Sequence, residues 1–347
     1  MLHGLKYKGL GVGFKGWERF YASVNPENIN ESIVQLKVPM SRNPLGKTFS
    51  YLLLESRTLI DTGVPTDEAY QGLKDQLKRY NLKPQDIERV VITHLHNDHI
   101  GLVEGLREYG AEIWAGEAAK ERQEQMVKEW ENLYENTLKE LDLFGGQEYK
   151  HNITRNKYVF KSDVKPMPID RYLQDGEKIN IGDLELEVIW TPGHSYEHIC
   201  LLNQAQRILF SGDHVLPKIT SHVALYSYRN HDPLNEYLTS LAKVENIDVD
   251  TILPGHEWIF NDLKPRVQQL YRHHRNRLDE MKATLEDGPQ TVYDVGRKVH
   301  WDSRPWPEMT FWTKRMAATE TYAHLVYLKN KGEIKEELSG ETYYFSL

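Results

Sequence analysis

The apolar residues of the first 265 or so positions alternate between short runs and stretches with helical spacing. Residues 32–40 and 49–55 are apolar or β-branched runs that predict strands. A helix is expected after Pro65, with Thr66 or Asp67 as its cap, since apolar residues then recur at intervals close to 3.6. Strands alternating with helices predict an α/β fold.

A long charged helix is expected between residues 117 and 143, ended by Gly145 and Gly146. The polar stretch that follows reaches residue 170, so we interpret 117–170 as an insertion on the main fold. Two uses of it remain open, a surface helix packed on the core or a wall or lid over the substrate. Strand-like or helical patterns then resume at 184–190, 199–203, 207–210, 234–244 and 251–253.

The last part of the chain has a different pattern, of helices followed by a hairpin. Helices are expected at 265–286, 291–299 and 314–330, and strands at 333–338 and 341–345 around Ser339-Gly340. This order resembles a small winged-helix-like α+β domain. We therefore predict a catalytic domain over 1–264 and a winged-helix-like domain over 265–347.

The composition excludes several classes of protein. Of the 347 residues, 39% are hydrophobic and 27% charged, and the mean hydropathy is −0.63, which is typical of a globular protein. No apolar run approaches the roughly 20 residues of a membrane helix. The N-terminus lacks a signal-peptide pattern, and the single cysteine, Cys200, fits a reducing compartment, so a cytoplasmic location is expected.

Charge argues against nucleic acid as the partner. The net charge is −8, and residues 266–347 contain 13 basic and 12 acidic residues, a balance of only +1. A domain that reads nucleic acid would be more basic. We favour a structural or dimer-forming use of the C-terminal domain, supported by the aromatic segment 301–312, over substrate gating or nucleic-acid contact.

Four apolar runs end in the same way, with a turn and then a histidine or an aspartate. Gly193, Gly212 and Gly255 directly precede three of these side chains and allow tight turns. In a layered α/β protein, residues just beyond the carboxyl ends of strands gather along one edge, where ligands bind. The side chains that follow the runs are His94, His96, Asp98, His99, His194, Asp213 and His256.

Imidazole nitrogens and carboxylate oxygens at such an edge indicate a site for divalent metals of the zinc type. The run His-x-His-x-Asp-His at 94–99 is the strongest part of the pattern. Seven donors shared by two metals would leave coordination positions open, as in a catalytic site. We assign His94, His96 and His194 to one metal, Asp98, His99 and His256 to a second, and Asp213 to a bridge between them.

These residues, with Asp61-Thr62-Gly63 upstream, resemble the motif series of the metallo-β-lactamase superfamily. Their order and approximate spacing match over residues 30–260, and the glyoxalase II-like hydrolases are the most similar branch. The resemblance implies an αββα sandwich with two metals at one edge and the seven residues as ligands. It also implies that Asp61 supports the ligands from behind.

The expected function is hydrolysis. Two divalent metals, zinc as first choice with manganese or iron as alternatives, would acidify a bridging water, which attacks the carbonyl of a thioester, lactone or ester. Asp98 would orient this water and move a proton to the leaving group. Two enzymatic alternatives remain open, an RNA phosphodiester hydrolase with the same metal pair and a mononuclear iron oxygenase.

Some residues near the expected edge have two interpretations. His214, Lys218 and His222 follow Asp213 and are candidate contacts to a small anionic substrate or an oxyanion. Each could equally be an ordinary hydrogen-bonded loop residue. His198 is expected to be a buried hydrogen-bonding residue, and a homodimer is a possible assembly.

Overall fold

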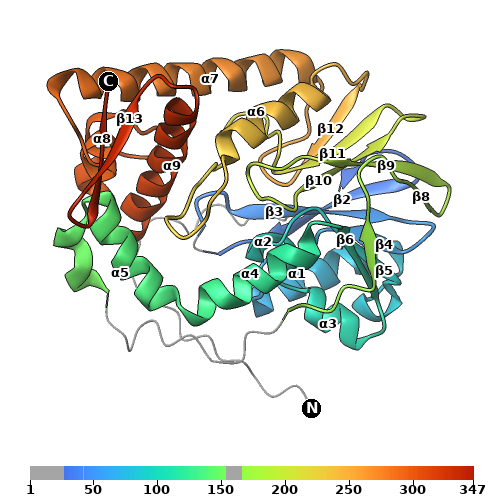
Figure 1. Cartoon of the computed structure of the whole chain (residues 1–347). Coiled ribbons are helices and arrows are strands. Elements are labelled where there is room, and N and C mark those ends of the chain that lie inside the picture. The colour runs from blue at the N-terminus through green and yellow to red at the C-terminus, as the bar shows by residue number, and fades with distance from the viewer. Residues whose placement is uncertain (1–26, 42, 154–165) are drawn as a thin grey trace.

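The computed structural model describes residues 27–41, 43–153 and 166–347, and two β-sheets stacked face to face form its centre. Helices α6 (Pro233–Val244) and α7 (Leu263–Thr284) cover one outer face, and α1 (Asp67–Leu77) and α3 (Val103–Glu108) cover the other (Figure 1). This order of layers is the αββα sandwich that the sequence predicts. Thr66 caps α1 by accepting a hydrogen bond from the Ala69 amide.

The first sheet takes its strands in chain order. The pairs from β1 to β4 are antiparallel and those from β4 to β7 are parallel. The strands are β1 (Glu27–Asn28), β2 (Ile33–Pro39), β3 (Lys47–Leu53), β4 (Thr58–Ile60), β5 (Arg89–Ile92), β6 (Glu112–Gly116) and β7 (Arg171–Leu173). The carboxyl ends of β4 and β5 therefore lie at the same edge.

The second sheet is an antiparallel meander with one parallel strand added. β8 to β11 pair antiparallel, and β12 joins β11 in parallel, so β9, β11 and β12 all point the same way. The strands are β8 (Lys178–Ile181), β9 (Leu184–Trp190), β10 (Ile199–Asn203), β11 (Ile208–Gly212) and β12 (Thr251–Pro254). Three carboxyl ends thus come together at one edge.

Apolar side chains alternate between the two faces of the second sheet, and both faces are buried. In β10, Ile199 and Leu201 lie between the two sheets, whereas Cys200 and Leu202 belong to the outer cluster with α6 and α7. Cys200 is fully buried, and burial raises the pKa of its thiol to about 12. It is therefore an inert core residue, as the sequence indicates.

The insertion contains two helices where the sequence predicts one. α4 (Ala119–Glu131) and α5 (Leu133–Phe144) meet at Asn132, whose backbone is not helical. The Asn132 side chain donates a hydrogen bond to the Lys128 carbonyl, 2.9 Å away, and this local bond competes with a continuous helix. The middle of the predicted insertion, residues 154–165, lies outside the described residues.

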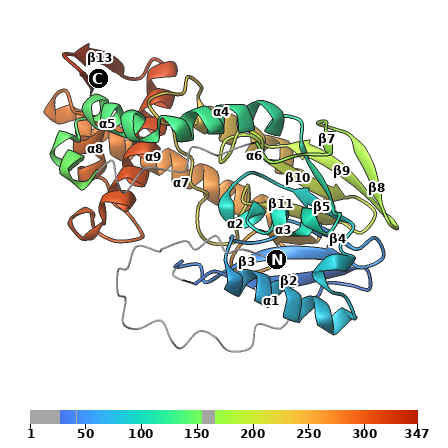
Figure 2. The ribbon, with the colours of Figure 1, turned by 90° about the horizontal axis from the view of Figure 1, so that it is seen from below.

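The C-terminal elements follow the predicted order, α7, α8 (Val292–Lys298), α9 (Phe311–Asn330) and the hairpin β13 (Lys335–Ser339) and β14 (Thr342–Ser346). They share one hydrophobic cluster with α5, α6 and the outer face of the second sheet. Figure 2 shows this group packed at one end of the sandwich. Within the described ranges, none of the helices is both long and apolar enough to cross a membrane.

Candidate metal centre

The seven predicted ligands converge at the edge where the two sheets meet. His94 follows β5 of the first sheet, and His194, Asp213 and His256 follow β9, β11 and β12 of the second. His96, Asp98 and His99 are reached because the chain turns after β5 into the short helix α2 (Asn97–Ile100). Three overlapping groups have ligand atoms within 4.8 Å of one another: His94, His96 and His194; His94, His99 and Asp213; and Asp98, His99 and His256.

Asp213 lies between the group of His94, His96 and His194 and the group of Asp98, His99 and His256. Its Oδ2 is 3.7 Å from His194 Nε2 and 3.3 Å from His256 Nε2, and its Oδ1 is 3.5 Å from His99 Nε2. One oxygen of this carboxylate thus faces both His194 and His256, and the other faces His99. This is the place that a bridging ligand requires.

Four of the histidines direct the same nitrogen into the site. Each has its Nδ1 within hydrogen-bond distance of an oxygen on the protein, so that its Nε2 is directed towards the other candidate ligands. The partners are Thr93 Oγ1 for His94 (3.0 Å), Asp61 Oδ2 for His99 (2.8 Å), the His222 carbonyl for His194 (2.9 Å) and the Lys47 carbonyl for His256 (3.2 Å). His96 instead brings Nδ1 to 3.0 Å from His194 Nε2.

Asp61 holds two of these ligands. It follows β4 in the left-handed region (φ 59°) and is buried. Its carboxylate accepts hydrogen bonds from the Thr93 amide (2.8 Å), the Thr93 hydroxyl (2.7 Å) and His99 Nδ1. Because the Thr93 hydroxyl donates to Asp61, its oxygen accepts from His94 Nδ1, so a single carboxylate orients His94 and His99.

The arrangement fits divalent cations. His94 Nε2, His99 Nε2 and Asp213 Oδ1 are buried and have no hydrogen-bond partner among the described residues. Buried polar atoms of this kind are rare unless an ion or a water satisfies them. A Cβ atom on Gly255 would come within 2.3 Å of Asp213 Oδ1 and 2.7 Å of His99 Cε1, so the glycine keeps this space open.

The protonation of the histidines differs across the site. Burial lowers the pKa of His194 to about 3 and that of His94 well below its usual value, so both imidazoles are neutral near pH 7. Burial also opposes the charge of His256, but the Asp213 and Asp98 carboxylates outweigh it and raise the pKa of His256 to about 10. A cation must therefore displace a proton there.

His198 supports Asp213, the candidate bridging ligand. It is fully buried, its Nδ1 lies 2.8 Å from Thr191 Oγ1, and its Nε2 accepts a 3.2 Å hydrogen bond from the Asp213 amide. The structure therefore gives it the buried hydrogen-bonding position that the sequence predicts.

Glu197 is a supporting residue that the sequence analysis missed. Its buried Oε1 accepts a 2.9 Å hydrogen bond from the amide of Leu95, which lies between His94 and His96, and another from the hydroxyl of Ser195 beside His194. One carboxylate thus ties two ligand-bearing turns together. In the sequence, only its position three residues after His194 could have suggested this supporting role.

The three candidate substrate contacts occupy different places. His214 is fully buried, with its ring 5.3 Å from that of Tyr237. Lys218 is exposed. His222 lies with its Nε2 3.1 Å from the Met316 carbonyl, while its own carbonyl holds His194.

The C-terminal helices hold the loop that carries these residues. Arg266 of α7 donates hydrogen bonds to the carbonyls of Leu216, Lys218 and Ile219, at 2.6 to 2.8 Å. The Thr319 carbonyl of α9 accepts a 3.0 Å bond from the Leu225 amide. The loop at 213–232, which we call the β11 loop, is therefore fixed by helices outside the predicted catalytic domain.

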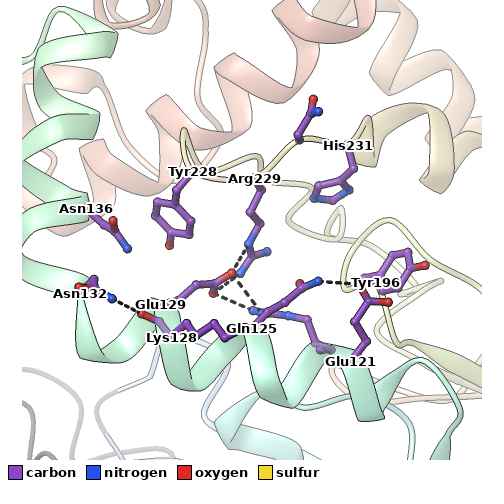
Figure 3. A pocket seen from close by; sticks show the side chains of 12 residues that line it. Glu121, Gln125, Lys128, Glu129, Asn132, Asn136, Tyr196, Tyr228, Arg229 and His231 are labelled. Carbon is purple, nitrogen blue, oxygen red and sulfur yellow. Dashed lines mark hydrogen bonds and ion pairs between the residues drawn. The ribbon is translucent and has the colours of Figure 1, made fainter.

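A cavity of about 580 Å³ opens beside the centre, between α4 and residues 228–231 of the β11 loop. Figure 3 shows Arg229 of the β11 loop reaching across to Glu129 of α4. Arg229 bonds to Glu129 at 2.7 and 2.8 Å and Arg122 at 3.2 and 3.3 Å. The insertion thus forms one wall of a cavity.

Comparisons with known proteins agree with this fold. A family model described as "Metallo-beta-lactamase superfamily" matches residues 44–256, and the chain belongs to this family. A probable metallo-hydrolase of Bacillus subtilis, YqjP, is 27% identical over 325 residues, covering 91% of this chain and 98% of that protein. An atrochrysone carboxyl ACP thioesterase of Aspergillus fumigatus is 28% identical over 131 residues, 38% of this chain and 39% of that protein.

Among solved structures, a metallo-beta-lactamase family protein from Thermus thermophilus superposes with a TM-score of 0.76 and 27% identity. The superposition covers 92% of this chain and 99% of that one. The similarity extends beyond the family match, so it includes most of the C-terminal helices.

Proposed function

We propose that the protein is a dinuclear metal-dependent hydrolase of thioesters, with lactones and simple esters as related carbonyl substrates. The observation that carries the proposal is the set of buried lone pairs on His94, His99 and Asp213 that have no partner among the described residues. His94, His96 and His194 would hold one cation, Asp98, His99 and His256 the other, and Asp213 would bridge them, with zinc as the first choice.

When bound, such cations supply a water acidified towards neutral pH and an electrophile for the carbonyl oxygen. The protein's own groups supply the remaining chemistry. Asp98 is partly exposed and lies 3.4 Å from His256 through its Oδ2, so it can accept a proton from the attacking water and pass it on. Burial opposes its charge, but the hydrogen bond from His256 outweighs this and holds the pKa of Asp98 below its usual value.

The reaction then balances simply. A C–O bond forms between water and the carbonyl carbon, the C–S bond breaks, and the proton removed from the water ends on the sulfur of the leaving thiol. The products are a carboxylic acid and a thiol. Asp61, Glu197 and His198 act as positioning residues, because they hold the ligand turns and touch no substrate.

The choice of thioesters rests on two supports. One relative bears the name of an acyl carrier protein thioesterase, and its matched segment covers 38% of this chain. The other support is the cavity beside the ligand turns, which gives room for a leaving group. A buried lone cysteine fits a reducing, cytoplasmic compartment, where free thiol products persist.

The test is a substrate panel at fixed metal content. The chain is stripped with a chelator, reloaded with zinc, manganese or iron, and assayed on acyl thioesters, lactones and an RNA phosphodiester. We expect metal-dependent turnover that is fastest on thioesters. Turnover of RNA alone, or oxygen consumption with a single iron per chain, would contradict the proposal.

A further inference from the structure

Charged and neutral polar side chains both line the cavity between α4 and the β11 loop. Of the charged residues in the lining, Glu121 and Lys128 are exposed, and the less exposed ones pair with one another. Glu129 takes both Arg122 and Arg229, and His231 lies 3.2 Å from Glu236. A ligand carboxylate would have to replace Glu129 at both guanidinium groups, which leaves the displaced carboxylate without a partner.

Side-chain amides and phenols make up much of the remaining lining. The residues are Gln125, Asn132, Asn136, Asn230, Tyr196 and Tyr228. In the described part of the chain, the side-chain amides of Asn136 and Asn230 have no hydrogen bond to another residue, and both line the cavity. A primary amide presents a donor and an acceptor side by side, which matches the N–H and C=O of a secondary amide.

The cavity is coupled to the ligand turns through Tyr196 and Glu197. Tyr196 lies two residues beyond His194, and its carbonyl is fixed by a 2.7 Å hydrogen bond from Trp190 Nε1. Arg122, on the cavity wall, brings its Nε to 3.9 Å from the Oε2 of Glu197, whose other oxygen holds the amide of Leu95. A group bound in the cavity therefore lies next to the turns that carry His94, His96 and His194.

From this lining and this position we infer that the cavity binds the leaving thiol's arm, and that the arm is uncharged and carries amides, as pantetheine does. The inference rests on the proposed thioester hydrolysis and adds the recognition of one substrate half. A volume of about 580 Å³ is ample for such an arm. The acyl half would then lie outside this cavity, on the other side of the scissile bond.

The test compares thioesters that share one acyl group and differ in the thiol. The acetyl thioesters of pantetheine, glutathione and propanethiol offer a neutral arm with amides, a charged arm with amides and an arm without amides. We expect kcat/KM to be highest for the pantetheine thioester, by about ten-fold or more over propanethiol if two or more hydrogen bonds of about 1 kcal/mol are made. Equal values for pantetheine and propanethiol, or a preference for glutathione, would overturn the inference.

Variants test whether the preference for the pantetheine thioester arises in the cavity. Asn136→Leu removes one amide from the cavity and keeps a good helix-forming residue in α5. It should lower kcat/KM for the pantetheine thioester about five-fold and leave the propanethiol thioester unchanged. The matched control, Asn180→Leu on the exposed side of β8, should change neither. An equal loss on both substrates would overturn the inference.

A binding measurement separates the two proposals. S-methylpantetheine is a thioether that cannot be hydrolysed, and calorimetry measures its binding to the metal-loaded chain. Binding to the unaltered chain that weakens in Asn136→Leu supports the cavity assignment even if no thioester is turned over, a result that would defeat only the proposed function. Thioester turnover without such binding would defeat only the cavity assignment.

Discussion

The turn after β5 and the β11 loop both serve the metal centre, but they are held in place by different parts of the molecule. In the first, residues 94–99 contain four candidate ligands, and Asp61 and Glu197 support them from within the sandwich. In the second, the chain contributes Asp213 directly and holds His194 through the His222 carbonyl. That loop is in turn held by Arg266 of α7 and by backbone groups of α9.

This difference teaches that the C-terminal helices are part of the support of the site. The orientation of His194 thus depends on a loop that a remote segment of the chain holds in place. The comparison predicts that damage to the β5 turn acts on metal binding directly. Damage to the C-terminal support should act mainly through the group that contains His194.

The largest effect is expected for Asp213→Asn. The variant keeps the shape of the side chain but loses the charge that faces both ligand groups, so several kcal/mol of cation stabilisation disappear. Turnover should fall at least about 1,000-fold, which corresponds to about 4 kcal/mol. Thioester kinetics and circular dichroism, measured together, check that the loss is chemical. A folded variant with near-normal turnover would mean that Asp213 is no bridge.

Asp61→Asn should have the next largest effect. Asparagine tolerates the left-handed backbone at this position, but an NH2 group replaces one of the two carboxylate oxygens, so the side chain cannot accept all three hydrogen bonds from Thr93 and His99. Metal affinity should fall about 10- to 100-fold, as for other supports behind histidine ligands. Titration of the metal-free chain against a competing chelator measures it. Unchanged affinity would show that His94 and His99 need no such support.

Arg266→Ala tests the remote support. The loss of three hydrogen bonds to loop carbonyls should lower the free energy of unfolding by about 2 kcal/mol and weaken one of the two bound cations about ten-fold. The matched control is Arg272→Ala, an exposed arginine of the same helix. Chemical unfolding and metal titration of both variants check the difference. If the two variants behave alike, the β11 loop does not depend on α7.

The smallest effect concerns a histidine pair between α7 and α9. His324 is fully buried, its Nδ1 lies 2.8 Å from the Glu320 carbonyl, and its Nε2 is 3.1 Å from His274 Nδ1. Burial lowers the pKa of His324 to about 3, so the folded chain leaves it neutral where the unfolded chain takes up a proton. The unfolded state therefore binds more protons between pH 6.5 and 3, and this contribution to stability falls as the pH drops through that window.

His324→Asn removes this contribution. Its free energy of unfolding should fall less steeply than that of the unaltered chain between pH 7 and 5, by up to about 1.4 kcal/mol per pH unit. Urea unfolding at several pH values measures the slope. His300→Asn, at an exposed histidine, should retain the original slope. An unchanged slope in His324→Asn would show that the pair is not held neutral.

The sequence allowed the fold and the convergence of the candidate ligands to be predicted because both depend on short-range patterns. Each ligand follows an apolar run and a turn, and the strands before His94, His194, Asp213 and His256 lie where expected. The supports were harder to foresee. Thr93 and Asp61 are 32 residues apart, and His194 is held by a backbone carbonyl 28 residues away, which no side-chain pattern reveals.

The same reasoning explains the other differences. Asn132 looks compatible with a long charged helix, and only its bond to Lys128 shows the break. The buried place of His214 depends on Tyr237 of α6, which approaches through tertiary packing. The glyoxalase II-like branch, the winged-helix class, the boundary at residue 264 and a homodimer stay predictions.

The most direct measurement of the central claim is the number of divalent cations retained per chain. Elemental mass spectrometry gives this ratio for the unaltered chain and for His194→Ala, after each has been reloaded with the divalent metal and dialysed exhaustively. The proposed dinuclear site predicts two cations per chain and the loss of at least one in the variant, with thioester turnover lost alongside. A chain that retains no cation yet keeps its turnover, or a variant with an unchanged ratio, would contradict it.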